Sequence, residues 1–297
     1  MDMDTCFLAV DGGGTFLKAA LFSGMEMLED TFFKIPACSG GSLEEIRGAF
    51  RSLGQRAAQE ARASGRTVSA AAVGMPGPFG YKGGILNMTH KFTAARGRSV
   101  RPWIQEGLGD VPVAFGHDST LFFRGGAYLE DLSGCRDICG VTLGTGLGFA
   151  AVKDGKLLVD EDGGPGISLW GRPYRGSIAE DYVSRRAVIR EYEAASGRKG
   201  LDVYDISLLA RAGDPAALGA FAALGRDLGA VAGETIRENA FEVLLLGGAI
   251  SKSADLFLPA LQESLRRLDR PPRIRTVKDI DRAPLYGAAA LCAEGLG

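Results

Sequence analysis

Two glycine-rich turns, each placed between two short apolar runs, constrain the possible folds of this chain most. The first is the Asp-Gly-Gly-Gly-Thr segment from Asp11 to Thr15, and the second is the Leu-Gly-Thr-Gly-Leu-Gly segment from Leu143 to Gly148. This pattern predicts a β-hairpin at each place. Glycine accepts positive φ and has no side chain, so the N–H groups of such a turn can approach a phosphate closely. One turn alone could serve only its hairpin, but two in one chain indicate a nucleotide site with two halves.

Length and composition indicate a two-domain protein. At the usual size of roughly 100–200 residues per domain, 297 residues are enough for two domains. The 34 basic residues nearly balance the 36 acidic ones, so the net charge of −2 favours neither nucleic acid nor a membrane as a partner. The five cysteines are odd in number and lie mostly within apolar runs, as is typical of reduced thiols. With neither a signal-peptide pattern nor a long apolar run, we expect a cytoplasmic protein.

Apolar runs alternate with helix-like segments in the first part of the chain. Strands are predicted near residues 6–10, 16–22 and 26–33, and Ser42-Leu43-Glu44-Glu45 has the capping-box pattern that begins a helix running to about residue 64. Two further predicted strands, 67–73 and 111–115, end in polar loops. Because the carboxyl ends of parallel strands meet at one edge of a sheet, where α/β proteins bind their ligands, these loops are expected to line a ligand crevice.

The same order of elements repeats in the second part. Strands are predicted between residues 138 and 159, a helix near 176–195, and a long helix beginning at Asp214-Pro215, an N-cap followed by a proline in the first helical position. The apolar run 241–246 leads into Gly247-Gly248. Such a strand–glycine–helix step lets a purine or a phosphate lie against the backbone, although ordinary packing of a strand and a helix explains it equally.

Five motifs in register resemble those of the ROK family of sugar kinases, over nearly the whole chain. In chain order they are Asp-Gly-Gly-Gly-Thr at 11–15, Met-Pro-Gly-Pro at 75–78, Asp118, Thr-Leu-Gly-Thr-Gly-Leu-Gly at 142–148 and Leu-Gly-Gly-Ala-Ile-Ser at 246–251. The resemblance implies an α/β protein of the actin/hexokinase superfamily, with two ribonuclease-H-like domains, each a mixed sheet with flanking helices, that close on ATP and a sugar. We expect a small N-terminal domain at 1–118, completed by a C-terminal helix at 284–297, and a larger domain at 119–283.

The resemblance also implies ATP and Mg²⁺ as cofactors. Asp11 would hold Mg²⁺ through water molecules, and Lys18 would add positive charge near the phosphates, although a solvated lysine at a sheet edge explains Lys18 equally. The residues implied to contact ATP through the two turns and the later glycine step are Gly12, Gly13, Gly14, Thr15, Gly144, Thr145, Gly146, Gly247 and Gly248.

Asp118 is the implied catalytic residue. A carboxylate at the end of a strand can accept the proton of a sugar hydroxyl as that hydroxyl attacks the γ-phosphorus. An aspartate in this position can also cap the following helix, and the two roles are compatible.

The implied sugar-binding residues are Gly77, Pro78, Asn87, His117, Asp118 and Glu180. The chain departs from the family at His117, where typical members have asparagine, so an imidazole would meet the sugar in place of an amide. Glu180 matches the family's sugar-contacting glutamate by alignment on Tyr182, but a glutamate near a helix start is often only a favourable partner of the helix dipole. Weaker candidates are His90, Lys91, Trp103 and Trp170.

A second departure lies at residues 163–182, where typical members carry Glu-x-Gly-His and a zinc-binding cysteine cluster. This stretch has neither cysteine nor histidine, and Ile178 stands at the last ligand position. A structural zinc needs four such ligands, so we expect no zinc site and a loop held by packing of Trp170, Pro173 and Tyr174.

The resemblance implies an ATP-dependent kinase that phosphorylates a hexose-type sugar at its 6-hydroxyl, and we expect a homodimer. The alternative is a sugar or nucleotide sensor with weak or no catalysis, favoured by the missing Glu-x-Gly-His. Family members that act as repressors place a helix-turn-helix module before the first glycine turn, whereas here that turn begins at Asp11. The sequence therefore does not favour a DNA-binding role.

Overall fold

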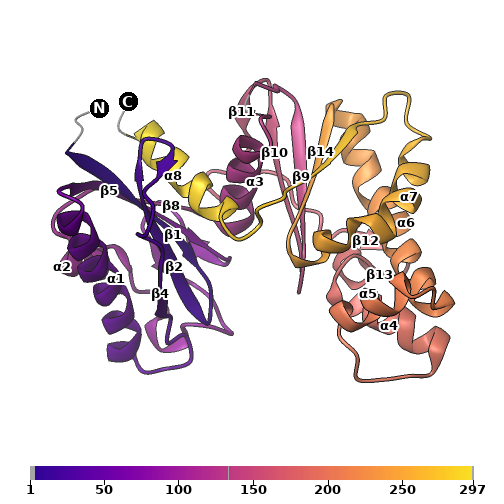
Figure 1. Ribbon diagram of the computed structural model, residues 1–297, viewed down its shortest axis with the longest axis horizontal. Helices are drawn as coiled ribbons and strands as arrows, with labels where there is room; N and C mark the ends of the chain where they lie inside the picture. The colour runs from indigo at the N-terminus through magenta and orange to yellow at the C-terminus, as the bar shows by residue number, and fades with distance from the viewer. Residues whose placement is uncertain (1–3, 133, 296–297) are drawn as a thin grey trace. The chain divides into compact units, whose positions relative to one another are not determined.

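The chain folds into two compact α/β units, seen in a computed structural model that describes residues 4–132 and 134–295 (Figure 1). The first unit comprises Met1–Leu129, Val159–Pro165 and Asp281–Gly297, and the second comprises Glu130–Leu158 and Gly166–Ile280. The boundary between the two units lies after Leu129, because the helix that starts at Asp118 packs within the first unit.

The first unit is built on a six-stranded mixed sheet with the order β3-β2-β1-β5-β8, in which β4 pairs with β2. β1 and β2 are antiparallel, whereas β1, β5 and β8 run parallel. Its elements are β1 (Thr5–Gly12), β2 (Phe16–Ser23), β3 (Glu26–Met27), β4 (Phe33–Pro36), α1 (Leu43–Ala63), β5 (Thr67–Met75), β6 (Phe79–Gly80), β7 (Ile85–Leu86), η1 (Thr93–Ala95), α2 (Arg101–Leu108), β8 (Val113–His117), α3 (Asp118–Leu129) and α8 (Ala283–Gly295).

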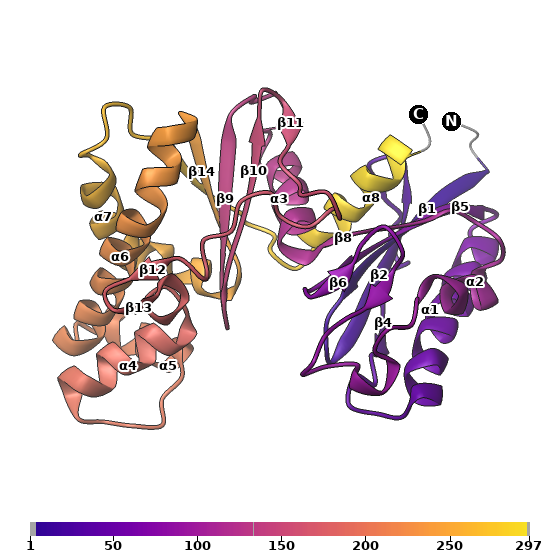
Figure 2. The same ribbon diagram turned by 180° about the vertical axis from the view of Figure 1, so that it is seen from behind.

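Helices α1 and α2 lie on one face of this sheet and α8 lies on the other (Figure 2). An apolar core fills the space between the sheet and the helices on each face. Leu8 and Val10 of β1 belong to the core under α1 and α2, and the alternate residues Phe7 and Ala9 belong to the core under α8. Helix α1 begins with the expected capping box at Ser42. The predicted strand at 26–33 is wrong in extent, since two short strands, β3 and β4, stand in its place.

Helices α3 and α8 cross with their backbones in contact. A Cβ atom at Gly125 of α3 would collide with the carbonyl oxygen of Ala283, and one at Gly287 of α8 would collide with the carbonyl oxygen of Leu121. Only glycine permits this approach. The crossing fixes the helix that begins at Asp118 against the last helix of the chain.

The second unit has a five-stranded mixed sheet with the order β11-β10-β9-β14-β15 and one large core, to which residues of α4–α7 contribute. Its elements are β9 (Ile138–Leu143), β10 (Leu147–Lys153), β11 (Lys156–Leu157), β12 (Pro173–Tyr174), β13 (Ser177–Ile178), η2 (Ala179–Asp181), α4 (Arg185–Ser196), α5 (Val203–Arg211), α6 (Pro215–Asn239), β14 (Val243–Gly247), η3 (Ala249–Ser253), α7 (Ala254–Leu265) and β15 (Arg273–Thr276). Asp214 caps α6 as predicted, through its bond from the Ala217 N–H.

The predicted helix at 176–195 is wrong over its first half. The β12–β13 hairpin and the short helix η2 precede α4, which begins only at Arg185. Arg175 (φ 47°) and Gly176 (φ 83°) both adopt positive φ at the hairpin tip, which a continuing helix excludes.

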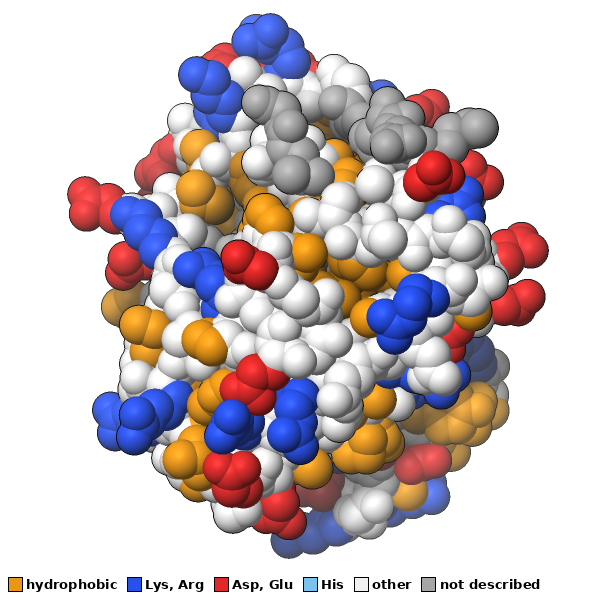
Figure 3. Space-filling view, turned by 90° about the vertical axis from the view of Figure 1, so that its left-hand side faces the viewer, with side chains coloured by type: hydrophobic (Ala, Val, Ile, Leu, Met, Phe, Trp, Pro, Cys, Tyr) orange, Lys and Arg blue, Asp and Glu red, His pale blue; other side chains and the backbone are white. Residues whose placement is uncertain are grey.

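Charges of both signs are interspersed on the face of the molecule shown in Figure 3. On α1, for example, Arg47 pairs with Glu106 of α2 at 2.9 Å and Arg56 pairs with Glu60 at 2.6 Å. Among the described residues, no helix combines the length and apolar character needed to cross a membrane.

Candidate active site

The first glycine turn closes the hairpin of β1 and β2. The Gly13 N–H donates to the carbonyl of Phe16 at 3.0 Å, and Asp11 pairs in register with Lys18. A Cβ atom at Gly12 would collide with the sulfur of Met75 and would lie 2.6 Å from the carbonyl oxygen of Gly74. Glycine is thus needed at this position for the turn to lie against the end of β5.

The register of the parallel strands brings the predicted loops together. Asp11 of β1 pairs with Gly74 of β5, and Met75 of β5 pairs with His117 of β8. The carboxyl ends of all three strands therefore lie at one edge of the sheet, with Asp118 directly after the last of them. This is the edge at which α/β proteins bind their ligands.

Asp118 is the first residue of α3, and its side chain is 42% exposed. Its Oδ1 atom accepts from the Ser119 N–H at 2.6 Å and lies 3.0 Å from Nδ1 of His117. Partial burial acts to raise the pKa of Asp118, but the hydrogen bond and charge of His117, the Ser119 N–H and the ammonium of Lys91 outweigh it and lower the pKa. The carboxylate is thus ionised at neutral pH, as a proton acceptor must be.

Asp11 is less exposed, at 20% of its side chain, and Lys18 Nζ lies 3.5 Å from its Oδ2. Burial raises the pKa of Asp11, the ammonium of Lys18 opposes the rise, and the nearby carboxylates of Asp118 and Asp281 add to it. One carboxylate beside a glycine turn fits Mg²⁺, which proteins often bind through one or two carboxylates together with substrate phosphates.

His117, Gly77 and Tyr81 lie together. A Cβ atom at Gly77 would lie 3.7 Å from both His117 Nε2 and the Tyr81 hydroxyl, and the rings of Tyr81 and His117 are 5.9 Å apart. Burial, followed by the carboxylates of Asp118 and Asp160, raises the pKa of Tyr81. Sequence reasoning missed Tyr81, although its place shortly after the Met-Pro-Gly-Pro motif was a signal.

The other candidates from this part of the sequence are dispersed. Pro78 follows Gly77 through a cis peptide bond, and Asn87 and His90 are exposed on the connection after β7. Trp103 packs 6.3 Å from Phe50, ring to ring, on the core under α1. Core packing therefore accounts for Trp103 without a sugar.

The second glycine turn, at 144–146, is braced by the segment that follows β13. The Arg185 N–H donates to the carbonyl of Gly144 at 2.8 Å, and the Leu147 N–H donates to Glu180 Oε2 at 3.0 Å. Glu180 Oε1 pairs with Arg186 at 3.1 Å. A Cβ atom at Gly146 would lie 2.5 Å from Glu180 Oε2, so glycine leaves room for this carboxylate. Both oxygens of Glu180 are thus engaged in holding the turn, a role that the sequence did not indicate.

Gly247 and Gly248 lie beside the same turn. Gly247 pairs with Thr142 of β9, and a Cβ atom at Gly248 would collide with the carbonyl of Leu143. Gly248 also has φ 81°, which favours glycine. The second unit therefore brings these two predicted motifs together.

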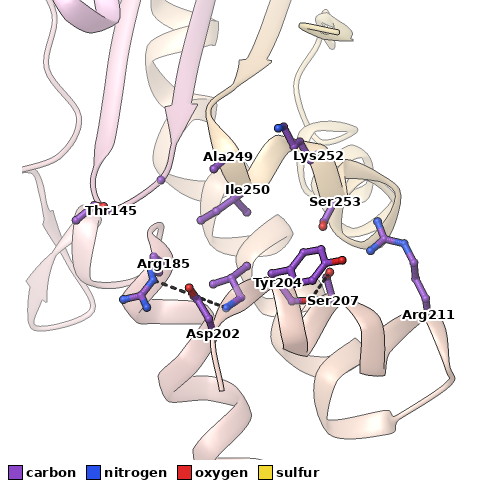
Figure 4. A pocket seen from close by; sticks show the side chains of 12 residues that line it. Thr145, Arg185, Asp202, Tyr204, Ser207, Arg211, Ala249, Ile250, Lys252 and Ser253 are labelled. Carbon is purple, nitrogen blue, oxygen red and sulfur yellow. Dashed lines mark hydrogen bonds and ion pairs between the residues drawn. The ribbon is translucent and has the colours of Figure 1, made fainter. Parts of the chain in front are cut away.

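A cavity of about 370 Å³ opens beside these glycines (Figure 4). Figure 4 shows side chains from α5 on one side and from the segment after Gly248 on the other; most of these residues were not predicted. Arg185 and Asp202 pair at 2.9 Å at its rim, and Arg211 pairs with Asp255 at 2.8 Å. The lining residues are Gly144, Thr145, Arg185, Asp202, Val203, Tyr204, Ser207, Arg211, Ala249, Ile250, Lys252 and Ser253. Such a size suits a small organic ligand.

The stretch at 163–182 is held both by packing and by polar contacts: Tyr174 packs against the core of the second unit, as expected. Asp227 of α6, whose side chain is 6% exposed, accepts from the Tyr174 hydroxyl at 2.9 Å and pairs with Arg175 at 3.0 Å. The expected packing of Trp170 is wrong, because this residue is 54% exposed. Ile178 and the absence of cysteine and histidine do not fit zinc. In the part of the chain that the structure describes, no group of three or more His, Cys, Asp or Glu side chains is arranged to hold a metal ion.

The two mixed sheets with flanking helices define the two-domain α/β fold of ROK and hexokinase-type proteins. The sequence matches the ROK family over residues 7–168 and 171–294, and the chain belongs to this family. No curated protein matches it.

Several solved structures share the fold. A ROK hexokinase from Thermus thermophilus is 24% identical, with a TM-score of 0.79 over 98% of this chain and 99% of that one. A ROK glucokinase from Streptomyces griseus, in complex with glucose and AMPPNP, is 23% identical, with a TM-score of 0.76 over 96% of this chain and 98% of that one. A ROK transcriptional regulator, a homologue of the E. coli MLC protein, is 21% identical, with a TM-score of 0.83 over 99% of this chain and 79% of that one. The fold is thus common to kinases and regulators.

Proposed function

We propose that this protein is an ATP-dependent sugar kinase that transfers the γ-phosphoryl group to the 6-hydroxyl of a hexose-type sugar. The observation that carries the proposal is an ionised, partly exposed Asp118 at the carboxyl edge of the first sheet, beside Asp11 and the first glycine turn. The glucose and AMPPNP bound by the Streptomyces griseus relative support the same substrate classes here.

In the proposed reaction Asp118 acts as the general base. The oxygen of the sugar hydroxyl forms a bond to the γ-phosphorus, the bond from that phosphorus to ADP breaks, and the hydroxyl proton passes to the carboxylate. The contacts of Asp118 among the described residues all use Oδ1, which leaves Oδ2 for the hydroxyl. His117 orients the carboxylate through Nδ1, while its Nε2 faces Gly77 and contacts the sugar.

In the first unit, the turn at 12–15 offers backbone N–H groups to the nucleotide phosphates. Asp11 would hold Mg²⁺, which would neutralise charge on those phosphates. In the second unit, the turn at 144–146 offers N–H groups of the same kind. The cavity beside Gly247 and Gly248 takes the adenosine, with Tyr204 available to pack against the base.

A coupled assay for ADP release over a panel of hexoses, amino sugars and glucosides tests the function. Asp118→Asn is expected to lower kcat by about 10²–10⁴ while ADP binding stays unchanged, because only the base is lost. Asp110→Asn, at an exposed aspartate of the same unit, is the matched control. Unchanged turnover in Asp118→Asn would remove this residue from the mechanism.

The alternative is a sensor that binds a sugar or nucleotide without turnover. Two observations support this alternative: the stretch at 163–182 lacks Glu-x-Gly-His, and the chain shares its fold with a regulator. Binding of a sugar in calorimetry, without phosphorylation of any sugar in the panel, would favour this alternative.

A further inference from the structure

The side chain of Lys91 lies directly over the first glycine turn. A Cβ atom at Gly14 would lie 2.8 Å from Cδ, 2.9 Å from Cε and 3.3 Å from Nζ of Lys91. The missing side chain at Gly14 therefore provides the space that the end of the lysine occupies. Sequence reasoning had placed Lys91 only among weak sugar-site candidates, because its loop is distant from the turn in the sequence.

A set of buried contacts holds the lysine there. The next residue, Phe92, is fully buried in the core under α1, and its N–H donates to the carbonyl of Ser39 at 2.6 Å. The Ser39 hydroxyl in turn donates to the carbonyl of Gly14 at 2.6 Å. Phe92 also has φ 54°, a region that a bulky residue rarely adopts and that is found where surrounding contacts impose it. The loop that carries Lys91 is thus tied to the glycine turn by Ser39.

Lys91 differs from Lys18 in its charge partners. Lys18 lies 3.5 Å from a carboxylate oxygen of Asp11, so its charge is already balanced. Lys91 takes part in none of the ion pairs among the described residues. It is nevertheless partly buried, and its charge lowers the pKa of Asp118. A partly buried ammonium without a carboxylate partner, over a turn that presents N–H groups, is suited to an anionic ligand.

We infer that Lys91 is a catalytic residue that donates hydrogen bonds to the γ-phosphoryl group as it passes from ATP to the sugar hydroxyl. This inference rests on the proposed function and adds to it the cation that stabilises the transferring group. The charge that builds on the non-bridging phosphoryl oxygens falls next to Gly14, where Nζ lies. Proton acceptance stays with Asp118.

The test compares three variants in steady-state kinetics, with ATP saturating and the sugar concentration varied. Lys91→Met is expected to lower kcat by about 10²–10³, the usual loss for one group that stabilises transition-state charge, with KM for the sugar changed less than about threefold. Lys91→Arg keeps the charge and is expected to recover at least part of the loss. Lys82→Met, at an exposed lysine of the same connection between β5 and α2, is the control with unchanged kinetics.

A pH profile separates direct contact from an effect through Asp118. If Lys91 contacts the phosphoryl group directly, kcat of Lys91→Met is lower than that of the wild type at every pH. If Lys91 acted only by lowering the pKa of Asp118, the loss would be confined to the acid limb, and this result would overturn the inference. An unchanged kcat, or a rise in sugar KM alone, would also overturn it.

A binding experiment keeps the inference separate from the proposed function. Calorimetry measures the affinity of the wild type and of Lys91→Met for ADP with Mg²⁺, without and with aluminium fluoride, which mimics the transferring phosphoryl group. Lys91→Met is expected to weaken only the complex with aluminium fluoride, by about tenfold or more, whether or not any sugar is phosphorylated. Equal affinities of the two proteins for that complex would refute the role of Lys91. Absence of sugar phosphorylation by the wild type would refute only the proposed function.

Discussion

Replacing Asp227 by alanine is expected to loosen the β12–β13 hairpin from helix α6. The variant loses the hydrogen bond from the Tyr174 hydroxyl and the pair with Arg175. A hydrogen bond to a charged group contributes about 1.5–3 kcal/mol. The pair with Arg175 contributes only about 0–1 kcal/mol, because the arginine side chain is 60% exposed and solvent screens it. The free energy of unfolding should therefore fall by about 1.5–4 kcal/mol.

Differential scanning calorimetry and urea unfolding measure this loss. For a domain of this size, about 1.5–4 kcal/mol corresponds to a fall in Tm of roughly 3–16 °C. Limited trypsin digestion gives a local reading, since cleavage after Arg175 should accelerate in Asp227→Ala. Asp227→Asn, which can still accept from Tyr174, should lose less than Asp227→Ala.

The matched control is Glu234→Gln, at an exposed carboxylate on the same helix. It is expected to change stability by less than about 0.5 kcal/mol. If Asp227→Ala were as stable as this control, with unchanged trypsin cleavage, the contacts of Asp227 would not anchor the hairpin and the reasoning would be refuted.

Two further predictions concern Tyr174 and the first glycine turn. Burial and the Asp227 carboxylate raise the pKa of Tyr174 to about 12. The stability that the neutral side chain contributes is therefore complete below the pKa of the unfolded state, about 10, and is lost as pH rises toward 12. In urea unfolding, the stability difference between wild type and Tyr174→Phe should shrink across this pH window, and a constant difference would contradict the prediction. Gly12→Ala should destabilise the protein by about 1–3 kcal/mol through the clash with Met75. The control is Gly144→Ala, whose added methyl group would meet nothing within 4 Å and which should fold normally. Equal unfolding midpoints for the two variants would contradict the clash.

Features that depend on neighbouring residues were predictable from the sequence. The capping box at Ser42 and the N-cap at Asp214 each act over three residues, and both helices start where these signals stand. The loops after the strands predicted at 67–73 and 111–115 were expected to meet at one sheet edge, because the carboxyl ends of parallel strands lie together. The parallel pairing of β5 and β8, which sets Met75 opposite His117, confirms this expectation.

Features that depend on distant contacts were not predictable. Gly176 adopts positive φ at the start of the segment expected to be helical, and the preceding residue, Arg175, is held by Asp227 on another helix. The bond from Leu147 to Glu180 and the position of Lys91 over Gly14 likewise join residues far apart in the sequence. Local sequence patterns do not encode contacts between distant residues. The contacts of Glu180 and Lys91 with the two glycine turns could therefore be identified only from the structure.

The close crossing of α3 and α8 sets an order of events during synthesis of the protein on the ribosome. The helix that begins with Asp118 is made before the second unit, but the helix whose Gly287 fits against Leu121 is made after it. At ~5–20 residues per second, the wait between them is about 10–30 s. The first unit therefore stays incomplete while the second unit is being synthesised. The residue proposed to do the chemistry gains its final support only after the second unit has been translated.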